Sequence, residues 1–292
     1  MQFLVYILVY PFLWLISILP FRLLYLVSDG LYILLYKIIG YRKKVVTNNL
    51  KLAFPDKTDK EIYIIRKKFY HHLCDMFLEM AKTLTISRKS LSKRFKLKNP
   101  EEAKRLEGLN KSVLLMYGHY ASWEWSLELQ NHTNLAGFAV YKRLANKYFD
   151  KLVRDIRSKF NTRLISTKQT ILTIKKSEAS GKKSITAFLS DQSPKISKDV
   201  YWGEFMGIEV PCFTGAERLA KKLDLVIAYL KITKVKRGYY EAEIMMLSET
   251  PQEHKDYKLT DMFLREVEKQ IYEAPEYYFW THKRWKHKDK KH

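Results

Sequence analysis

The pattern His119-x4-Glu124 places an imidazole and a carboxylate close together, directly after an apolar run that ends at Tyr117 and a glycine, Gly118. A neutral histidine that is oriented by a carboxylate can take a proton from an alcohol. These residue types therefore predict a transferase that acts on a hydroxyl group. The alternative is a surface histidine beside a helix-start glutamate, because the bare spacing arises often by chance.

Helical geometry limits where this pair can meet. Residues five apart on a regular α-helix point about 140° away from each other, so His119 and Glu124 cannot meet on one continuous helix. They can meet if His119 lies on a loop and Glu124 lies in the first helical turn, with Ser122 as the N-cap. We then expect Glu124 to accept a hydrogen bond from one imidazole nitrogen and to leave the other free as a base.

Further polar groups follow two other predicted strands. Asp191 and Gln192 come after the apolar run 184–190, and Arg143 comes after the run 137–141. We expect Asp191 to orient a substrate hydroxyl or to hold an arginine. Turn capping is the alternative, since aspartate is a common turn residue.

Arginine side chains and one apolar segment complete the candidate groups. Arg143, and Arg154 and Arg157 on a predicted helix, suit phosphate or carboxylate groups because guanidinium forks bind such groups in two places. The alternative is a solvated basic helix face. The glycine-containing segment 205–217 is expected either to line an acyl-chain channel or to form a packed loop.

The elements that must position these groups alternate between strands and helices. We expect strands at 112–117, 137–141, 184–190, 225–230 and 240–246, and helices at 58–82, 123–130, 147–160, 167–176, 214–223 and 258–273. This alternation predicts an α/β fold with a central, mostly parallel sheet flanked by helices. Sites in such sheets lie at the carboxyl ends of strands, where His119 and Asp191 are found.

Composition narrows the class of partner. The 292 residues are 47% hydrophobic and 14% aromatic, and their formal net charge is +22. Such a charge indicates an anionic partner, which is nucleic acid, acidic lipid head groups or an acidic protein. The two cysteines, Cys74 and Cys212, are far apart and match no metal spacing, so we expect no disulfide, no metal and no bound cofactor.

The N-terminal region favours a membrane. Residues 1–19 carry no charged side chain and would extend roughly 29 Å as a helix, which is close to the thickness of a bilayer core. Residues 1–40 are therefore expected to form a membrane-anchoring helical segment, and residues 41–292 the domain that carries the predicted transferase site. The alternative is a buried core hairpin. A membrane segment here could either span the bilayer or lie in its interface. The basic residues in the segment 41–44, which are Arg42, Lys43 and Lys44, predict that the domain lies on the cytoplasmic side.

Near the C-terminus, residues 275–286 mix aromatic and cationic side chains. Trp and Tyr lie at head-group depth in a lipid interface, where Lys and Arg meet phosphates. The same mixture also suits single-stranded nucleic acid. The apolar N-terminal region favours lipid, so nucleic acid is not the expected partner.

Taken in order, these motifs resemble the lipid A biosynthesis acyltransferase family, the lauroyl and myristoyl transferases that complete lipid A. The likeness covers nearly the whole chain. It is carried by Gly40-Tyr41-Arg42, Asn49-Leu50, Ala53-Phe54-Pro55, Gly118-His119 to Glu124, Val140-Tyr141-Lys142-Arg143, Arg157-Ser158, Asp191-Gln192, the glycine–Glu217 helix start, and Pro275-Glu276, Trp280 and His282-Lys283-Arg284-Trp285-Lys286.

The resemblance implies acyl transfer from acyl carrier protein to a hydroxyl of a glycolipid, at the cytoplasmic face of the inner membrane, with no other cofactor. By that resemblance His119 and Glu124 are the catalytic pair, and Arg157 and Asp191 are functional-site residues. Members often carry Arg-Pro after the tyrosine, where this chain has Lys142-Arg143-Leu144. We therefore expect Arg143 and Gln192 at the substrate site only because of where they stand in these motifs.

Two alternatives to acyl transfer onto a lipid A precursor remain at this point. The same fold family acylates other membrane lipids, so a lysophospholipid or an aminolipid is a second possible acceptor. A non-catalytic, membrane-tethered basic protein that binds acidic lipid or nucleic acid is the third interpretation. It leaves the histidine and the aspartate at the strand ends unexplained.

Overall fold

A seven-stranded sheet with the order β1-β9-β8-β2-β5-β3-β4 forms the centre of the protein. The structure is a computed structural model and describes residues 1–290. The strands of the sheet are β1 (Phe95–Leu97), β2 (Val113–Tyr117), β3 (Ala136–Tyr141), β4 (Thr162–Ser166), β5 (Ser184–Leu189), β8 (Val226–Lys236) and β9 (Tyr239–Ser248). Neighbouring strands are parallel except β8 and β9, which pair antiparallel. The expected α/β class is confirmed.

Strand β2 lies in the middle of the sheet, between β8 and β5. All five of its residues are buried, as expected for a strand in a parallel sheet that is covered on both faces. Its pairing with β5 places Tyr117 opposite Leu189, the last residue of each strand. The loops that follow these two strands must therefore start side by side.

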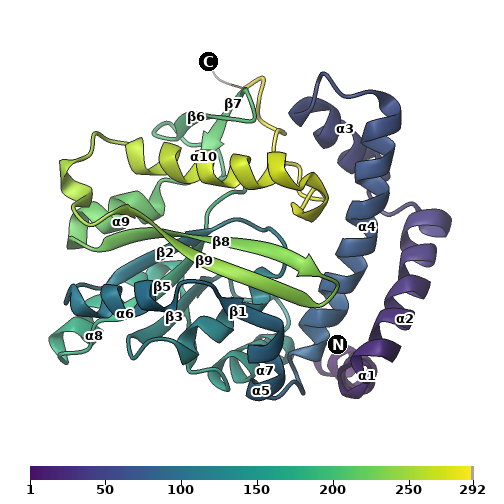
Figure 1. Cartoon of the computed structure of the whole chain (residues 1–292), viewed down its shortest axis with the longest axis horizontal. Helices are drawn as coiled ribbons and strands as arrows, with labels where there is room; N and C mark the ends of the chain where they lie inside the picture. The colour runs from purple at the N-terminus through teal and green to yellow at the C-terminus, as the bar shows by residue number, and fades with distance from the viewer. Residues whose placement is uncertain (291–292) are drawn as a thin grey trace.

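Helices cover both faces of the sheet, and Figure 1 shows α9 and α10 above it and α5 to α8 below it. Helices α9 and α10 contact β2 and β8, whereas α7 and α8 contact β4. The helices after residue 40 are α3 (Lys43–Ala53), α4 (Asp59–Lys82), α5 (Arg88–Arg94), α6 (Pro100–Gly108), η2 (Trp123–Asn131), α7 (Lys147–Ser158), η3 (Thr167–Gln169), α8 (Thr170–Ala179), α9 (Gly215–Leu223), η4 (Pro251–Glu253), α10 (Lys258–Glu273) and η5 (Pro275–Tyr277).

The N-terminal residues form α1 (Gln2–Ile18), α2 (Phe21–Tyr32) and the π-helix η1 (Ile33–Ile39). Helices α1 and α2 pack on α4, which stands at the right-hand end of the sheet in Figure 1. Lys82 of α4 donates hydrogen bonds to the carbonyl oxygens of Ser17 and Leu19, and so satisfies the C-terminal end of α1. The N-terminal helices are thereby joined to the rest of the fold.

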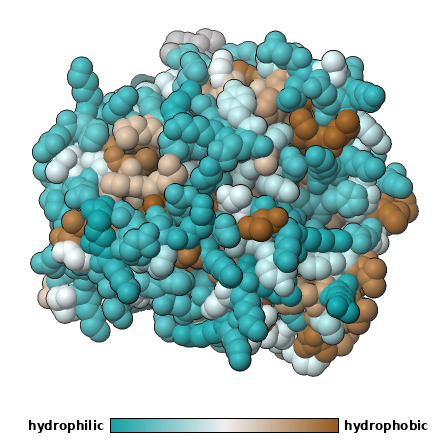
Figure 2. Space-filling view, in the orientation of Figure 1, coloured by the Kyte–Doolittle hydropathy of each residue, from teal (hydrophilic) through white to brown (hydrophobic). Residues whose placement is uncertain are grey.

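Much of the apolar surface of these helices faces outward. Leu8 and Phe12 are each 67% exposed, and Figure 2 shows hydrophobic residues gathered at the lower right, over α1 and α2. Among the described residues, no single helix is both long and apolar enough to cross a membrane. The pair formed by residues 21–39 and α3 passes that test together, but it is bent by 92°.

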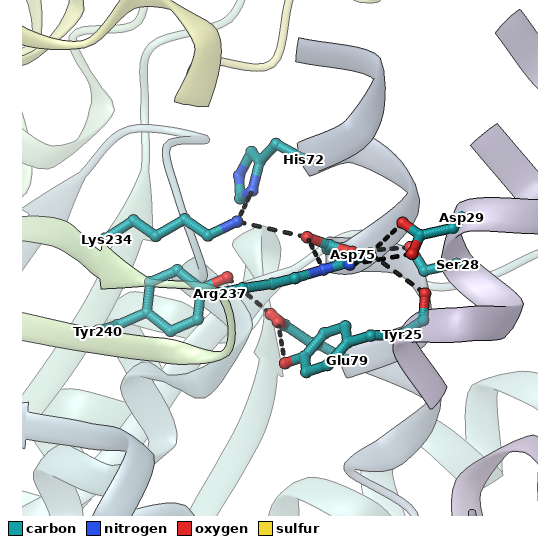
Figure 3. Close-up of polar contacts among 9 residues, drawn as sticks. All are labelled: Tyr25, Ser28, Asp29, His72, Asp75, Glu79, Lys234, Arg237 and Tyr240. Atoms are coloured by element: carbon teal, nitrogen blue, oxygen red, sulfur yellow. Dashed lines mark hydrogen bonds and ion pairs between the residues drawn. The ribbon is translucent and has the colours of Figure 1, made fainter. Parts of the chain in front are cut away.

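A partly buried polar cluster joins α2 to α4 and to the hairpin of β8 and β9. Its members are Tyr25, Ser28, Asp29, His72, Asp75, Glu79, Lys234, Arg237 and Tyr240 (Figure 3). Arg237 forms ion pairs with Asp29 of α2 at 2.6 Å and with Asp75 of α4 at 2.7 Å. Glu79 accepts hydrogen bonds from the hydroxyls of Tyr25 and Tyr240, both at 2.8 Å. Three separate elements therefore share one set of polar contacts.

Most predicted elements are present, with differences at the edges of the sheet. The helix expected at 123–130 is the 3₁₀-helix η2. The sequence patterns did not indicate the strands β1 and β4 or the two-stranded unit of β6 (Tyr201–Phe205) and β7 (Ile208–Cys212). β1 has only three residues, which is too short for a two-residue alternation to stand out.

Candidate active site

The loops after β2 and β5 bring His119 and Asp191 together. The Nδ1 atom of His119 lies 2.7 Å from the Oδ1 atom of Asp191. The Asp191 side chain is completely buried, and that of His119 is 19% exposed. The adjacency of β2 and β5 in the sheet produces this contact, since the two residues are 72 positions apart in the sequence.

The protonation of this pair follows from its surroundings. Burial acts to raise the pKa of the Asp191 carboxyl, but attraction to His119 and hydrogen bonds from it outweigh that effect, so the pKa lies below its ordinary value of 3.8. Asp191 is thus ionised at neutral pH and can only accept a hydrogen bond. The Nδ1 atom of His119 must carry the proton, which leaves Nε2 with a free lone pair. His119 is therefore oriented as a base.

In the structure His119 and Glu124 each contact another partner, and not each other as expected. Glu124 lies in the first turn of η2, as expected, but its Oε2 atom accepts a hydrogen bond from Nη2 of Arg157 at 2.5 Å. Ser122 occupies the N-cap position, yet its side chain makes no capping hydrogen bond. Asp191 takes the orienting role, and it holds the histidine rather than an arginine.

A second ion pair joins Glu124, five residues after His119 in the sequence, to Arg157. Both side chains are mostly buried, at 20% and 17% exposure. Arg157 comes from α7, so the pair connects this helix to the start of η2. Partial burial makes such a charge-assisted hydrogen bond stronger than one on the surface. Arg157 is thus the partner of Glu124, and its place in a substrate site stays a prediction.

The C-terminal segment 277–279 supports the loop that carries His119. The Phe279 amide donates to the His119 carbonyl at 3.0 Å, and the Ala121 amide donates to the Tyr277 carbonyl at 2.9 Å. Ala121 has a left-handed backbone with φ of 51°, which an L-residue adopts at an energetic cost. The rings of Trp123 and Phe279 lie 5.3 and 6.1 Å from the His119 ring. The loop conformation therefore depends on this segment.

Two more side chains of the C-terminal segment lie near the dyad. Burial, and then the charge of Asp191, raises the pKa of the Tyr278 hydroxyl. Burial lowers the pKa of His282 to about 4, so this histidine is neutral at pH 7. Its Nε2 atom accepts a hydrogen bond from the Ser193 amide at 3.3 Å. His282 consequently adds no positive charge close to His119.

A small apolar cavity of about 40 Å³ lies between η2 and the sheet. Its apolar lining comes from β2, β3, β5 and η2 and comprises Leu115, Leu127, Leu129, Phe138, Ala139, Ile185 and Ala187. Arg157 and Tyr117 also line it. At Gly137 a Cβ atom would lie 2.0 Å from the Gln130 Oε1 atom, so a larger residue there would require the Gln130 side chain to move. The cavity offers an apolar ligand a place next to the Glu124–Arg157 pair.

The remaining predicted residues do not all converge on His119. Arg143 is exposed and lines a different hollow, of about 580 Å³, together with Arg154 and Arg163. Gln192 follows Asp191 in the same loop and is partly exposed. The segment 205–217 does not line the apolar cavity. It contains the last residue of β6, Phe205, which stacks on Trp285, and the whole of β7.

Metal ligation is not indicated at this site. Within residues 1–290, no group of three or more His, Cys, Asp or Glu side chains is arranged to hold a metal ion. Cys74 and Cys212 are both free and buried. The arrangement instead offers a base, a buried carboxylate and an arginine beside an apolar cavity. These groups can activate a hydroxyl and stabilise a developing negative charge.

Comparison with known proteins agrees with this chemistry. The family described as bacterial lipid A biosynthesis acyltransferase matches residues 1–287. The chain is also similar to the lipid A biosynthesis lauroyltransferase of Escherichia coli (strain K12), with 23% identity over 278 residues. That match covers 94% of this chain and 89% of the relative.

Proposed function

The chain belongs to the bacterial lipid A biosynthesis acyltransferase family, and we propose that it moves a fatty acyl chain from acyl carrier protein to a hydroxyl of a lipid A precursor. Acyltransferase activity follows from the family and from the similar lauroyltransferase. The observation that carries the proposed mechanism is the contact between His119 and the buried Asp191 at the ends of β2 and β5.

The proposed reaction is a direct transfer. His119 Nε2 takes the proton from the acceptor hydroxyl while the oxygen attacks the thioester carbonyl. The tetrahedral intermediate then collapses, the carbon–sulfur bond breaks, and the thiolate takes the proton from the imidazolium. Asp191 stabilises that imidazolium through Nδ1. No acyl-enzyme forms in this scheme.

The pair of Glu124 and Arg157 has a separate role in the proposal. Arg157, or backbone amides at the start of η2, stabilises the oxyanion of the intermediate. Glu124 fixes the position of the guanidinium at 2.5 Å. The apolar cavity that Arg157 also lines receives the first part of the donor acyl chain. Arg143 and its neighbouring arginines bind phosphate groups of the acceptor.

We also propose that the protein acts at the inner membrane, with the site on the cytoplasmic side. The exposed apolar side chains of α1 and α2 support a position in the lipid interface. The basic residues that follow them, 42–44, favour the anionic cytoplasmic leaflet. The net charge of +22 attracts both anionic lipid and an acidic carrier protein.

The variant His119→Ala tests the base. With acyl carrier protein loaded with a fatty acid and a lipid A precursor, we expect the transfer rate to fall at least about 10²-fold, because a positioned base contributes this much. The control is His132→Ala. It changes the histidine at the C-terminal end of η2, away from the dyad, and should keep its activity. Retained transfer by a folded His119→Ala protein would disprove the proposed base.

Mass spectrometry of lipids from a deletion strain identifies the acceptor. The proposal predicts that lipid A loses one acyl chain and that expression of the protein restores it. Loss of an acyl chain from a phospholipid or an aminolipid instead would favour the alternative acceptor.

A further inference from the structure

Two sequence motifs that the proposed mechanism does not use, residues 40–55 and 275–286, contact each other. Three consecutive carbonyl oxygens, of Trp280, Thr281 and His282, accept hydrogen bonds from this first motif. Asn49 Nδ2 donates to Trp280 at 2.8 Å and to His282 at 2.7 Å. Arg42 Nη1 donates to Thr281 at 2.9 Å. We call this set of hydrogen bonds the clasp.

The chemistry of the clasp explains the residue type at position 49. Asn49 is 5% exposed, and its carboxamide nitrogen provides both of the hydrogens that the two carbonyls accept. An aspartate of the same shape has no such donors when it is ionised. It would leave the Trp280 and His282 carbonyls facing a negative charge in a buried place, which is costly.

The clasp lies directly behind the support of the catalytic loop. The residues that it holds, 280–282, continue from Tyr277 and Phe279, which exchange main-chain hydrogen bonds with Ala121 and His119. The ring of Phe279 also lies beside the His119 ring. Hence a short stretch of backbone connects α3 on one side with the dyad loop on the other.

We propose that Asn49 and Arg42 are positioning residues for acyl transfer, acting through residues 277–282 on His119. The clasp fixes this stretch, so that the loop keeps its left-handed turn at Ala121 and the imidazole stays on Asp191. The catalytic part of this inference rests on the proposed function. The structural part, which is that the clasp orders residues 118–122, does not.

Asn49→Asp tests the proposal in the full-length protein, with Asn48→Asp as a matched control. Asn48 is the neighbouring residue on the same helix, but it is exposed, so the same change there leaves the clasp intact. For Asn49→Asp we expect kcat to fall at least about tenfold with KM within twofold of the original value, since about 1.4 kcal/mol of lost positioning corresponds to this factor. Hydrogen exchange should become faster at residues 118–122 and 277–282. Asn48→Asp should change neither quantity.

Arg42 provides a second, milder test if Asn49→Asp folds poorly. Arg42→Met removes the donor to Thr281, and Arg42→Lys keeps a donor at that place. We expect Arg42→Met to lower kcat and to speed exchange at residues 118–122, and Arg42→Lys to restore both in part.

Two results would overturn the inference. One is a folded variant that lacks the clasp donors and still has the kcat of the unaltered protein. The other is unchanged exchange at residues 118–122 in Asn49→Asp and in Arg42→Met. Failure of the proposed function looks different, because then the unaltered protein transfers no acyl chain, and faster exchange in the variants still supports the structural part.

Discussion

At the scale of single residues, the carboxylate that orients His119 is Asp191, which has no exposed atoms. A buried carboxylate keeps its charge only when partners favour the ionised form, and here His119 is that partner. The histidine thus receives a fixed tautomer and a counter-charge from one contact. Glu124 is freed for a different task, which is to hold Arg157.

Asp191→Asn should reduce kcat by roughly 10²-fold or more, because the amide neither fixes the tautomer by charge nor stabilises the imidazolium. The measurement is the initial rate of acyl transfer at saturating donor. Asp199→Asn, on an exposed loop residue, is the matched control and should keep its rate. An Asp191→Asn protein as fast as the control would show that Asp191 does not orient the base.

The same substitution has a predictable effect on stability. The pKa of Asp191 is lowered in the folded state, so its charge stabilises the fold above its ordinary value of 3.8, and this stabilisation is lost as the pH falls below that value. Asp191→Asn should therefore melt at a lower temperature than the unaltered protein at pH 7. The difference should narrow below about pH 4.

Sequence patterns predicted that His119 follows the end of a strand, which the structure confirms, but they paired it with Glu124, whereas its side chain contacts Asp191. A spacing of five residues pointed to Glu124, whereas the contact with Asp191 spans 72 positions. That contact depends on β5 being the neighbour of β2, and strand order is not encoded in any local pattern. The one available signal was that Asp191, like His119, directly follows a buried strand.

At the scale of elements, α4 joins the N-terminal helices to the sheet through the polar cluster of Figure 3. Its N-terminus was predictable near residue 58, because Thr58 and Glu61 form a capping box, which is a pattern that can be recognised in a sequence. Its partners were not predictable, since Glu79 meets Tyr25 and Tyr240 from two distant elements. The 3₁₀ form of η2 also escaped prediction, because its apolar spacing resembles that of an α-helix.

Glu79→Gln should flatten the dependence of stability on pH. Burial raises the pKa of Glu79 to about 7, so its neutral form is favoured in the folded state. Its contribution to stability is fully present below its ordinary value of 4.5 and is lost as the pH rises through about 7. We expect the unaltered protein to lose up to about 3 kcal/mol between pH 5 and pH 8 from this group.

Thermal melts at the two pH values check this expectation. Glu79→Gln should show a smaller decrease in melting temperature than the unaltered protein. Glu101→Gln, on an exposed residue of α6, should behave like the unaltered protein. An equal decrease in all three proteins would mean that Glu79 is ionised throughout.

At the scale of the whole molecule, exposed apolar side chains are concentrated over α1 and α2 (Figure 2). The sequence predicted that the N-terminal region is helical and apolar. It also placed the end of the first helix at residue 19, next to the observed end at Ile18, but it did not predict that Lys82 would hold this end. The structure thus presents an apolar surface attached to the fold.

Replacing Leu8 and Phe12 by Asp should weaken binding to vesicles that contain anionic phospholipid. Each apolar side chain taken out of lipid costs about 1.5–3 kcal/mol, so the partition coefficient should fall more than about tenfold. Sedimentation with vesicles measures it. The control is Leu172→Asp, on an exposed residue of α8 away from α1. Equal binding of all three proteins would exclude α1 as the membrane surface.

The clasp and the loop support also relate the site to the order in which the chain is made. Residues 277–282 are synthesised long after His119, Glu124 and Asp191, yet they hold the histidine loop in its turn. A nascent chain that has reached only residue 274 already contains the base, its carboxylate and the arginine. It lacks the backbone against which they are set, so the geometry of the proposed site requires residues that are made well after its side chains.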